Sequence, residues 1–148
     1  KYRYMRDLVH RVKEAVVTVD GKVVGQIGIG CVLYVGFCET DTLDQVNKLA
    51  HRLPLARLFE DDQGKMNLST IDVKGSLLSI SLFTLYGDTE KGHRPSFAKA
   101  MDPKQAEVLY HAFNEGLRKA VPVETGVFRA MMEITQVNDG PVSILYES

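Results

Sequence analysis

The segment "VTVDGKVVGQIGIGCVLYVGF" constrains the fold most, because it places three strand-forming runs one short turn apart. The Asp-Gly pair at residues 20–21 separates valine-rich runs at 8–19 and 23–27, and this dipeptide is a strong signal for a two-residue hairpin. A second turn at 28–30 leads into residues 31–37, a nearly continuous apolar run that predicts a strand buried on both faces. The first quarter of the chain therefore predicts closely connected, antiparallel strands.

Two later stretches change to helical spacing. In residues 43–53 the apolar side chains recur every three or four positions, and Thr42 with Gln45 forms a capping-box pattern before them. Pro54 is expected to end this helix. A second helix is expected to begin at Asp102-Pro103, a capping residue followed by proline at the first helical position. Its buried stripe is predicted to comprise Ala106, Leu109, Tyr110, Phe113 and Leu117.

Three further strands are predicted, at residues 76–86, 127–137 and 142–146, with a polar turn around Gly64 and a polar loop at 87–97. Hairpins with few helices favour a mostly antiparallel, curved or barrel-like sheet over a doubly wound parallel one. The predicted class is α/β with two main helices, in a single domain of residues 1–148.

Composition excludes several classes of protein. The net charge is -1, from 18 basic and 19 acidic residues, which excludes a strongly basic nucleic-acid binder but leaves room for a local basic patch. No apolar run approaches the roughly 20 residues of a membrane helix. The first residues lack the apolar core of a signal peptide, and we expect Met5 to be the natural start, with residues 1–4 preceding it.

The residues that bind metals or form disulfides are sparse. Cys31 and Cys38 both lie in the apolar stretch "CVLYVGFC", where two small core residues in a reducing cytosol are favoured over a disulfide. The histidines are scattered, without a zinc-binding pattern or a carboxylate cluster, so no metal is expected.

The segment "SLFTLYGDTEKGHRPSF", residues 81–97, is the richest in chemistry-bearing side chains. On an extended strand Leu82 and Thr84 would point to one face, and Ser81 and Phe83 to the other. A nucleophilic threonine needs a positioned base, and nothing upstream in the sequence offers an obvious one.

The loop that follows carries three basic side chains, Lys91, His93 and Arg94. A hydroxyl at a strand end beside such a loop is suited to an anionic ligand that bears an ester. The alternative is a buried threonine, a surface serine and a solvated loop.

Five ordered segments resemble the D-aminoacyl-tRNA deacylases, also called D-tyrosyl-tRNA deacylases, and the resemblance as a whole covers essentially everything from Leu8 to the C-terminus. "SLFTLYGDTEKGHRPSF" is similar to the SQxTLY…KGxRPSF segment of that family, and "VNDGPVSI" is similar to its closing NxGPVT motif. "VTVDGKVVGQIGIG", "RLFEDDQGKMNLS" and "VETGVFRAMMEITQVNDGP" resemble its first hairpin, its RIFEDxxGKMNLS segment and its late strand. Two positions depart from the pattern: Leu82 replaces a glutamine, and Ser143 replaces a threonine.

The resemblance implies a cytoplasmic, homodimeric, barrel-like protein that needs no cofactor. It implies hydrolysis of the ester that joins a D-amino acid, or glycine, to the terminal adenosine of tRNA. In the family, Gly140-Pro141 carries a cis peptide bond and reaches into the pocket of the neighbouring subunit. Its carbonyl groups hold the substrate's α-amino group and exclude an L side chain, and Asn138 is expected to bind substrate beside them.

For the chemistry, the resemblance leaves two mechanisms open. Either Thr84 attacks the ester, or backbone N–H groups near Phe83 and Thr84, with Ser81 close by, form an oxyanion hole while the 2′-OH of the tRNA helps to activate water. The second is favoured, because no base for Thr84 is found. Leu82 is expected to contact substrate, and Lys91, His93 and Arg94 to contact tRNA. The rival is a non-catalytic module that binds adenosine or an RNA end.

Overall fold

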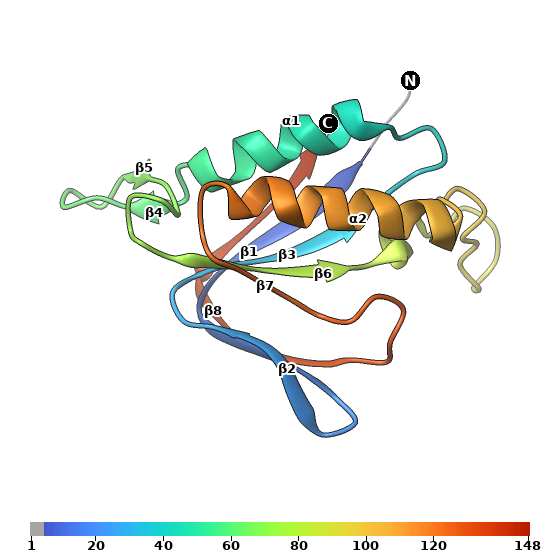
Figure 1. Ribbon diagram of the computed structural model, residues 1–148, viewed down its shortest axis with the longest axis horizontal. Coiled ribbons are helices and arrows are strands. Elements are labelled where there is room, and N and C mark those ends of the chain that lie inside the picture. The colour runs from blue at the N-terminus through green and yellow to red at the C-terminus, as the bar shows by residue number, and fades with distance from the viewer. Residues whose placement is uncertain (1–4) are drawn as a thin grey trace.

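The protein is described by a computed structural model over residues 5–148, in which two helices pack on one face of a curved sheet (Figure 1). The strands of the main sheet are β1 (Arg6–Val19), β2 (Lys22–Ile27), β3 (Gly30–Gly36), β6 (Ser76–Ser81), β7 (Val123–Thr125) and β8 (Glu133–Glu147). The remaining elements are α1 (Leu43–Arg52), α2 (Pro103–Arg118), the 3₁₀ helices η1 (Leu53–Leu55) and η2 (Phe83–Tyr86), and a hairpin of β4 (Phe59–Glu60) and β5 (Met66–Leu68). Residues 1–4, expected to precede the natural start, lie outside the described residues.

The long strand β1 organises the sheet. β8 pairs antiparallel along nearly all of one edge of β1, while β3 and β2 pair antiparallel with the first and second halves of the other edge. The sheet continues from β3 to β6 and β7 by parallel pairing, with α1 and α2 in the two crossovers. The prediction of a mostly antiparallel, barrel-like sheet with two helices is confirmed, and the parallel extension is an addition to it.

Curvature brings β2 back against the far side of the sheet. A methyl group on Gly25 of β2 would lie 2.6 Å from the carbonyl oxygen of Thr125 in β7, so only glycine permits this approach. The sheet is consequently almost closed, and it has apolar residues on both faces. One buried cluster lies between the sheet and the helices, and a smaller one, which includes Val17, Val32 and Leu78, lies inside the curve.

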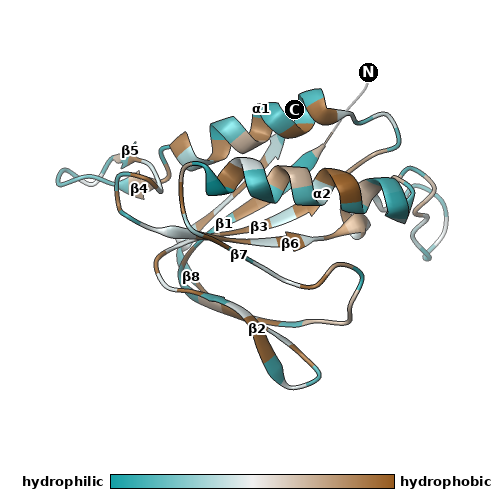
Figure 2. Ribbon diagram, viewed as in Figure 1, coloured by the Kyte–Doolittle hydropathy of each residue, from teal (hydrophilic) through white to brown (hydrophobic). Residues whose placement is uncertain are grey.

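The predicted start signals of both helices are confirmed. The Thr42 hydroxyl accepts from Asp44 N at 3.3 Å and Gln45 Oε1 accepts from Thr42 N at 2.7 Å, while Asp102 Oδ2 accepts from Gln105 N at 3.2 Å. All five residues of the predicted stripe of α2 are buried. Figure 2 shows the resulting pattern on both helices, with hydrophobic positions toward the sheet and hydrophilic ones outward.

The hairpin and the cysteines also follow the predictions. Asp20 and Gly21 have φ of 50° and 78°, the left-handed pair that a type I′ turn requires. Cys31 and Cys38 are both buried, and they do not form a disulfide with each other. Among residues 5–148, no helix combines the length and apolar character that crossing a bilayer requires.

The strand predicted at 76–86 is too long: β6 ends at Ser81 and the 3₁₀ helix η2 follows. The partner strand β3 ends at Gly36, and the last hydrogen bond between them joins Leu82 N to Val35 O at 2.7 Å. Beyond it the backbone has no strand to pair with, and local bonds such as Gly87 N to Thr84 O satisfy it instead. The alternation of faces inferred for residues 81–84 is therefore wrong.

The end of the chain differs in a second way. Residues 127–132 form a turn rather than a strand, and the predicted strands at 127–137 and 142–146 are parts of one strand, β8, from Glu133 to Glu147. Both parts pair with β1, and the extra residues around Gly140 form a bulge in the register between them. The short strand β7 was missed, because three residues carry too little pattern to identify it.

Candidate active site

A cavity of about 790 Å³ lies where β3 and β6 end and where η2, the start of α2 and the turn before β8 meet. Ser81, Leu82, Phe83 and Thr84 all line it, so the structure brings together the four site residues predicted from the central motif. Their strand ends at the cavity because its parallel partner ends there.

The 3₁₀ helix changes what these residues offer to a ligand. The first N–H groups of a helix have no intrahelical acceptor, and at η2 these belong to Phe83 and Thr84. Neither has an acceptor elsewhere among residues 5–148, and both residues are exposed at the cavity wall. Two adjacent backbone donors at a concave site can hold a developing oxyanion.

The Thr84 hydroxyl has no activating base. Within the described chain it makes no hydrogen bond, and Asp102 is the one carboxylate among the described residues that line the cavity. That carboxylate caps α2 by accepting from Gln105 N. The geometry favours backbone stabilisation over nucleophilic attack by Thr84.

The wall around these donors is largely apolar. Leu82 is half-buried against the cavity, and its side chain offers no hydrogen bond where the resembling motif has an amide. The rings of Phe83 and Phe97 lie 5.2 Å apart, centroid to centroid, and both are partly exposed to the cavity. Such a wall suits the apolar parts of an aminoacyl nucleoside.

The Gly140-Pro141 step lies in the β8 bulge, and its peptide bond is cis, as the resemblance implied. Gly140 has φ of 123°, a conformation that L residues rarely adopt. Both residues are exposed, and neither they nor Asn138 are among the described residues that line the cavity. Within one chain, then, the structure does not bring this step to Phe83 and Thr84.

Arg11 supports this step, and sequence reasoning missed it. Its buried guanidinium donates from Nε to the carbonyl oxygen of Asp139 at 3.1 Å and from Nη1 to that of Leu58 at 2.8 Å. A methyl group added to Gly140 would lie 3.0 Å from Arg11 Nη2. A lone arginine in a valine-rich strand, "HRVKEAVV", was the available signal, because buried arginines are rare without partners.

A chain of hydrogen bonds connects Asn138 to the cavity. Tyr34 lines the cavity and donates from its hydroxyl to Gln136 Oε1 at 2.8 Å, and Gln136 Nε2 donates to Asn138 Oδ1 at 2.6 Å. Burial raises the pKa of Tyr34, which keeps its hydroxyl protonated as the donor. Asn138 is therefore linked to the cavity by hydrogen bonds through Gln136 and Tyr34, which the sequence did not single out.

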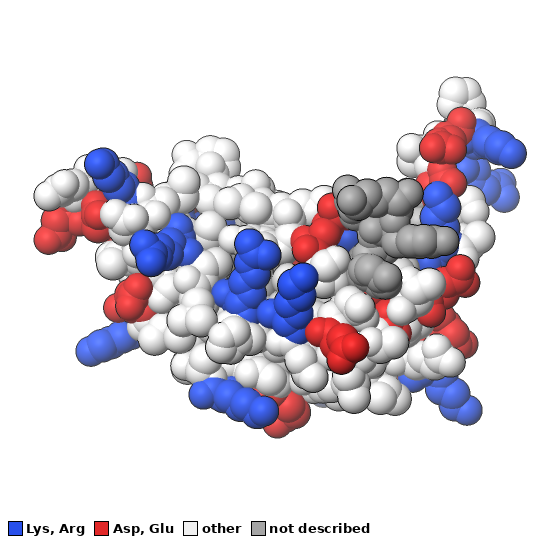
Figure 3. Space-filling view, turned by 90° about the horizontal axis from the view of Figure 1, so that it is seen from above, with Lys and Arg blue, Asp and Glu red and all other residues white. Residues whose placement is uncertain are grey.

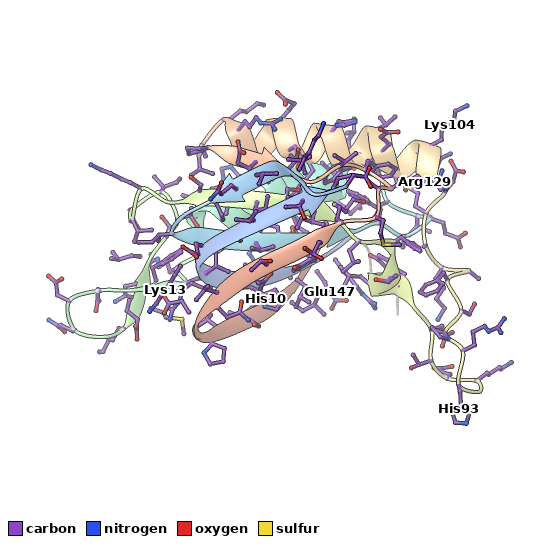
Figure 4. The ribbon with its side chains drawn as sticks, turned by 90° about the horizontal axis from the view of Figure 1, so that it is seen from below. His10, Lys13, His93, Lys104, Arg129 and Glu147 are labelled. Carbon is purple, nitrogen blue, oxygen red and sulfur yellow. The ribbon has the colours of Figure 1, made fainter. Side chains whose placement is uncertain are left out.

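The predicted tRNA-binding residues Lys91, His93 and Arg94 are exposed on a projecting loop. Paired backbone hydrogen bonds between Asp88 and Ser96 close its base, and Figure 4 shows His93 at its far tip. None of the three lines the cavity in the described chain, so the structure places them beside the site and not in it.

Charge on the helical face is mixed. Figure 3 shows Lys and Arg interspersed with Asp and Glu there, without an extended field of one sign. Contacts to a polyanion on this face would therefore be local. Among residues 5–148, no group of three His, Cys, Asp or Glu side chains is arranged to hold a metal ion.

Comparison with known families gives the class of this protein. The family described as D-Tyr-tRNA(Tyr) deacylase matches residues 8–147, so the chain belongs to this family. Among individual relatives, the D-aminoacyl-tRNA deacylase of an Exiguobacterium species is 56% identical over 144 residues, covering 97% of this chain and 98% of the relative.

Solved structures agree with the fold. The structure titled "c-Myc DNA Unwinding Element Binding Protein" is 37% identical with a TM-score of 0.91, and the match covers 97% of this chain and 98% of that one. A probable eukaryotic D-amino acid tRNA deacylase is only 16% identical, yet its TM-score is 0.84 over 97% of this chain and 99% of that one, which shows a shared fold.

Proposed function

We propose that this chain hydrolyses the ester between a D-amino acid and the terminal adenosine of tRNA, releasing the free amino acid and tRNA. Glycyl esters are also substrates, and L-aminoacyl esters are spared. The observation that carries the proposal is the pair of free backbone donors at Phe83 and Thr84, on the wall of a large cavity, in a member of this family.

Backbone groups and substrate supply the chemistry. Water attacks the ester carbonyl carbon, and the N–H groups of Phe83 and Thr84 stabilise the oxyanion that forms. The carbon–oxygen bond to the ribose then breaks, and the ribose oxygen takes a proton. The neighbouring 2′-OH of the tRNA assists the attacking water. Loss of one such donor typically costs about 10²–10³ in kcat, so a site of this kind functions without a side-chain nucleophile.

Chiral selection requires a second subunit. Gly140-Pro141 is exposed and lies away from its own cavity, and β8 also exposes apolar side chains at Val137, Ile144 and Leu145. A two-fold dimer through this strand would carry each Gly-Pro step into the partner's cavity, giving two equivalent sites. The carbonyl groups of the step would hold the α-amino group and leave no space for an L side chain.

Family membership does not favour the rival, a non-catalytic module that binds an RNA end. We propose a cytoplasmic location, because aminoacyl-tRNA is a substrate of that compartment and two buried cysteines without a disulfide suit a reducing environment.

The deciding assay measures release of the amino acid from D-Tyr-tRNA, L-Tyr-tRNA and Gly-tRNA by the purified chain. We expect release from the D and glycyl esters and little from the L ester. Equal release from both enantiomers contradicts chiral selection, and tight binding without release supports the rival.

A further inference from the structure

We infer that Arg129 and Lys104 bind backbone phosphate of the RNA strand next to the terminal adenosine, in a hollow beside the main cavity. The inference rests on the proposed function, which puts an aminoacyl adenosine in the main cavity. It adds a binding site for the RNA strand, which must extend out of that cavity.

The hollow adjoins the main cavity. It has a volume of about 370 Å³, and Asp102, Pro103, Phe128 and Arg129 line both spaces. Lys104, on the first turn of α2, lines the hollow but not the main cavity. Figure 4 shows Lys104 and Arg129 at the same end of the molecule, with His93 on the separate projecting loop.

The acidic and basic side chains that line the hollow differ in whether they have a partner within the described chain. Asp102 Oδ2 accepts from Gln105 N at 3.2 Å, and Glu107 Oε2 lies 3.4 Å from Nε2 of His111 on the next turn of the helix. Arg129 and Lys104 are both exposed, and neither has an ion-pair partner within residues 5–148. The anions have local partners while the cations remain free for a ligand.

The backbone at Arg129 gives a second reason. Its φ is 65°, in the left-handed region that glycine adopts without strain and other residues adopt at a cost. The turn is closed by a hydrogen bond from Ala130 N to Val127 O at 3.1 Å. Strained residues of this kind cluster at ligand sites. An arginine in this conformation therefore supports a ligand-binding role for its guanidinium.

The ligand chemistry fits this pair. A terminal nucleoside of RNA is followed directly by a phosphodiester, so a phosphate must lie just outside the cavity that holds the nucleoside. The arginine fork binds two phosphate oxygens, and lysine adds a point charge. Contacts to phosphate position an RNA without reading its sequence.

The test compares two substrates that differ in the phosphate. Arg129→Gly removes the cation and suits the left-handed backbone, so the turn is retained. We expect kcat/KM for D-Tyr-tRNA to fall about tenfold, mainly through KM, and kcat/KM for D-tyrosyl-adenosine to stay unchanged. Lys104→Gln should act in the same direction, and Lys119→Gln, at the other end of α2, should change neither.

Salt dependence and direct binding complete the test. The slope of log Kd for uncharged tRNA against log salt should become shallower by roughly 0.7 in Arg129→Gly, the value for one lost contact to a single strand. An equal fall on both substrates, or an unchanged kcat/KM for D-Tyr-tRNA, overturns the inference. If the wild-type chain hydrolyses neither substrate, the proposed function fails, and an unchanged Kd for tRNA in Arg129→Gly would separately overturn the subsite.

Discussion

At the scale of single residues, the proposed mechanism assigns the reactive groups of this site to the backbone. In that mechanism Phe83 and Thr84 act through their N–H groups, which lie unpaired at the cavity wall because they are the first donors of η2. Side-chain and backbone roles can therefore be separated by substitutions at the same positions.

Thr84→Ala should retain substantial activity, within about tenfold of the wild-type kcat, because both backbone donors survive. Single-turnover hydrolysis of D-Tyr-tRNA measures this directly. A covalent acyl-threonine intermediate detected by mass spectrometry would contradict the account, as would complete loss of turnover in a variant that folds and binds tRNA.

Phe83→Pro should lower kcat by a further 10²–10³-fold, roughly, relative to Phe83→Ala, because only proline removes the N–H group. Proline is tolerated at the first position of a helix, and the preceding Leu82, with φ of −141° and ψ of 89°, lies outside the α region that a following proline disfavours. Thermal melting of both variants controls for folding. Equal kcat values would show that this N–H group does not hold the oxyanion.

Asp7 offers a residue-scale prediction on stability. It is completely buried on β1, neither carboxylate oxygen has a hydrogen-bond partner within the described chain, and burial raises its pKa well above the ordinary value. A raised folded pKa means that stability is highest below the unfolded pKa, near 4, and falls as the pH rises through the folded pKa.

Asp7→Val should therefore raise the free energy of unfolding at pH 8 by about 1–3 kcal/mol and flatten its pH dependence. Urea unfolding between pH 4 and pH 9 measures both, with the exposed Asp62→Asn as the charge control. Parallel stability curves for wild type and Asp7→Val would refute the assignment.

At the scale of elements, β8 and η2 show how far sequence patterns reach. The hairpin at residues 20–21 and the caps of both helices were predictable, because each depends on local backbone chemistry. The end of β6 and the continuity of β8 were not, because both depend on where the paired strands β3 and β1 run. The four cavity residues of the central motif came from the resemblance. For Arg11 the sequence offers only an arginine among valines, and its contacts, like the backbone angle of Arg129, appear only in the structure.

Gly140→Ala should disturb the β8 bulge. Its φ of 123° is unfavourable for alanine, and the added methyl group would press on the Arg11 guanidinium, which holds the step through Asp139. We expect a lower kcat/KM for D-Tyr-tRNA and a smaller preference over L-Tyr-tRNA.

The matched control is Gly64→Ala in the β4–β5 hairpin. Gly64 also has a left-handed φ, 75°, but open space surrounds it. Both variants should lose about 1–2 kcal/mol of stability, and only Gly140→Ala should change the ratio of D to L hydrolysis. If a folded Gly140→Ala protein has an unchanged ratio of D to L hydrolysis, the Gly-Pro step does not contribute to chiral selection.

At the scale of the whole molecule, the proposed chiral selection requires two chains. One chain has the cavity and the donors at Phe83 and Thr84, and its exposed Gly-Pro step lies elsewhere on the surface. The apolar residues exposed along β8 give the step a surface through which it can reach a second copy. Mixing two differently damaged subunits tests whether the site is shared.

The most direct measurement is D-Tyr-tRNA hydrolysis by a heterodimer of Phe83→Pro and Gly140→Ala subunits, purified through two different tags. A shared site predicts about half of wild-type specific activity, because one of the two sites combines an intact cavity with an intact partner step. Heterodimer activity as low as that of both mutant homodimers, or full activity from a wild-type monomer, would contradict the account.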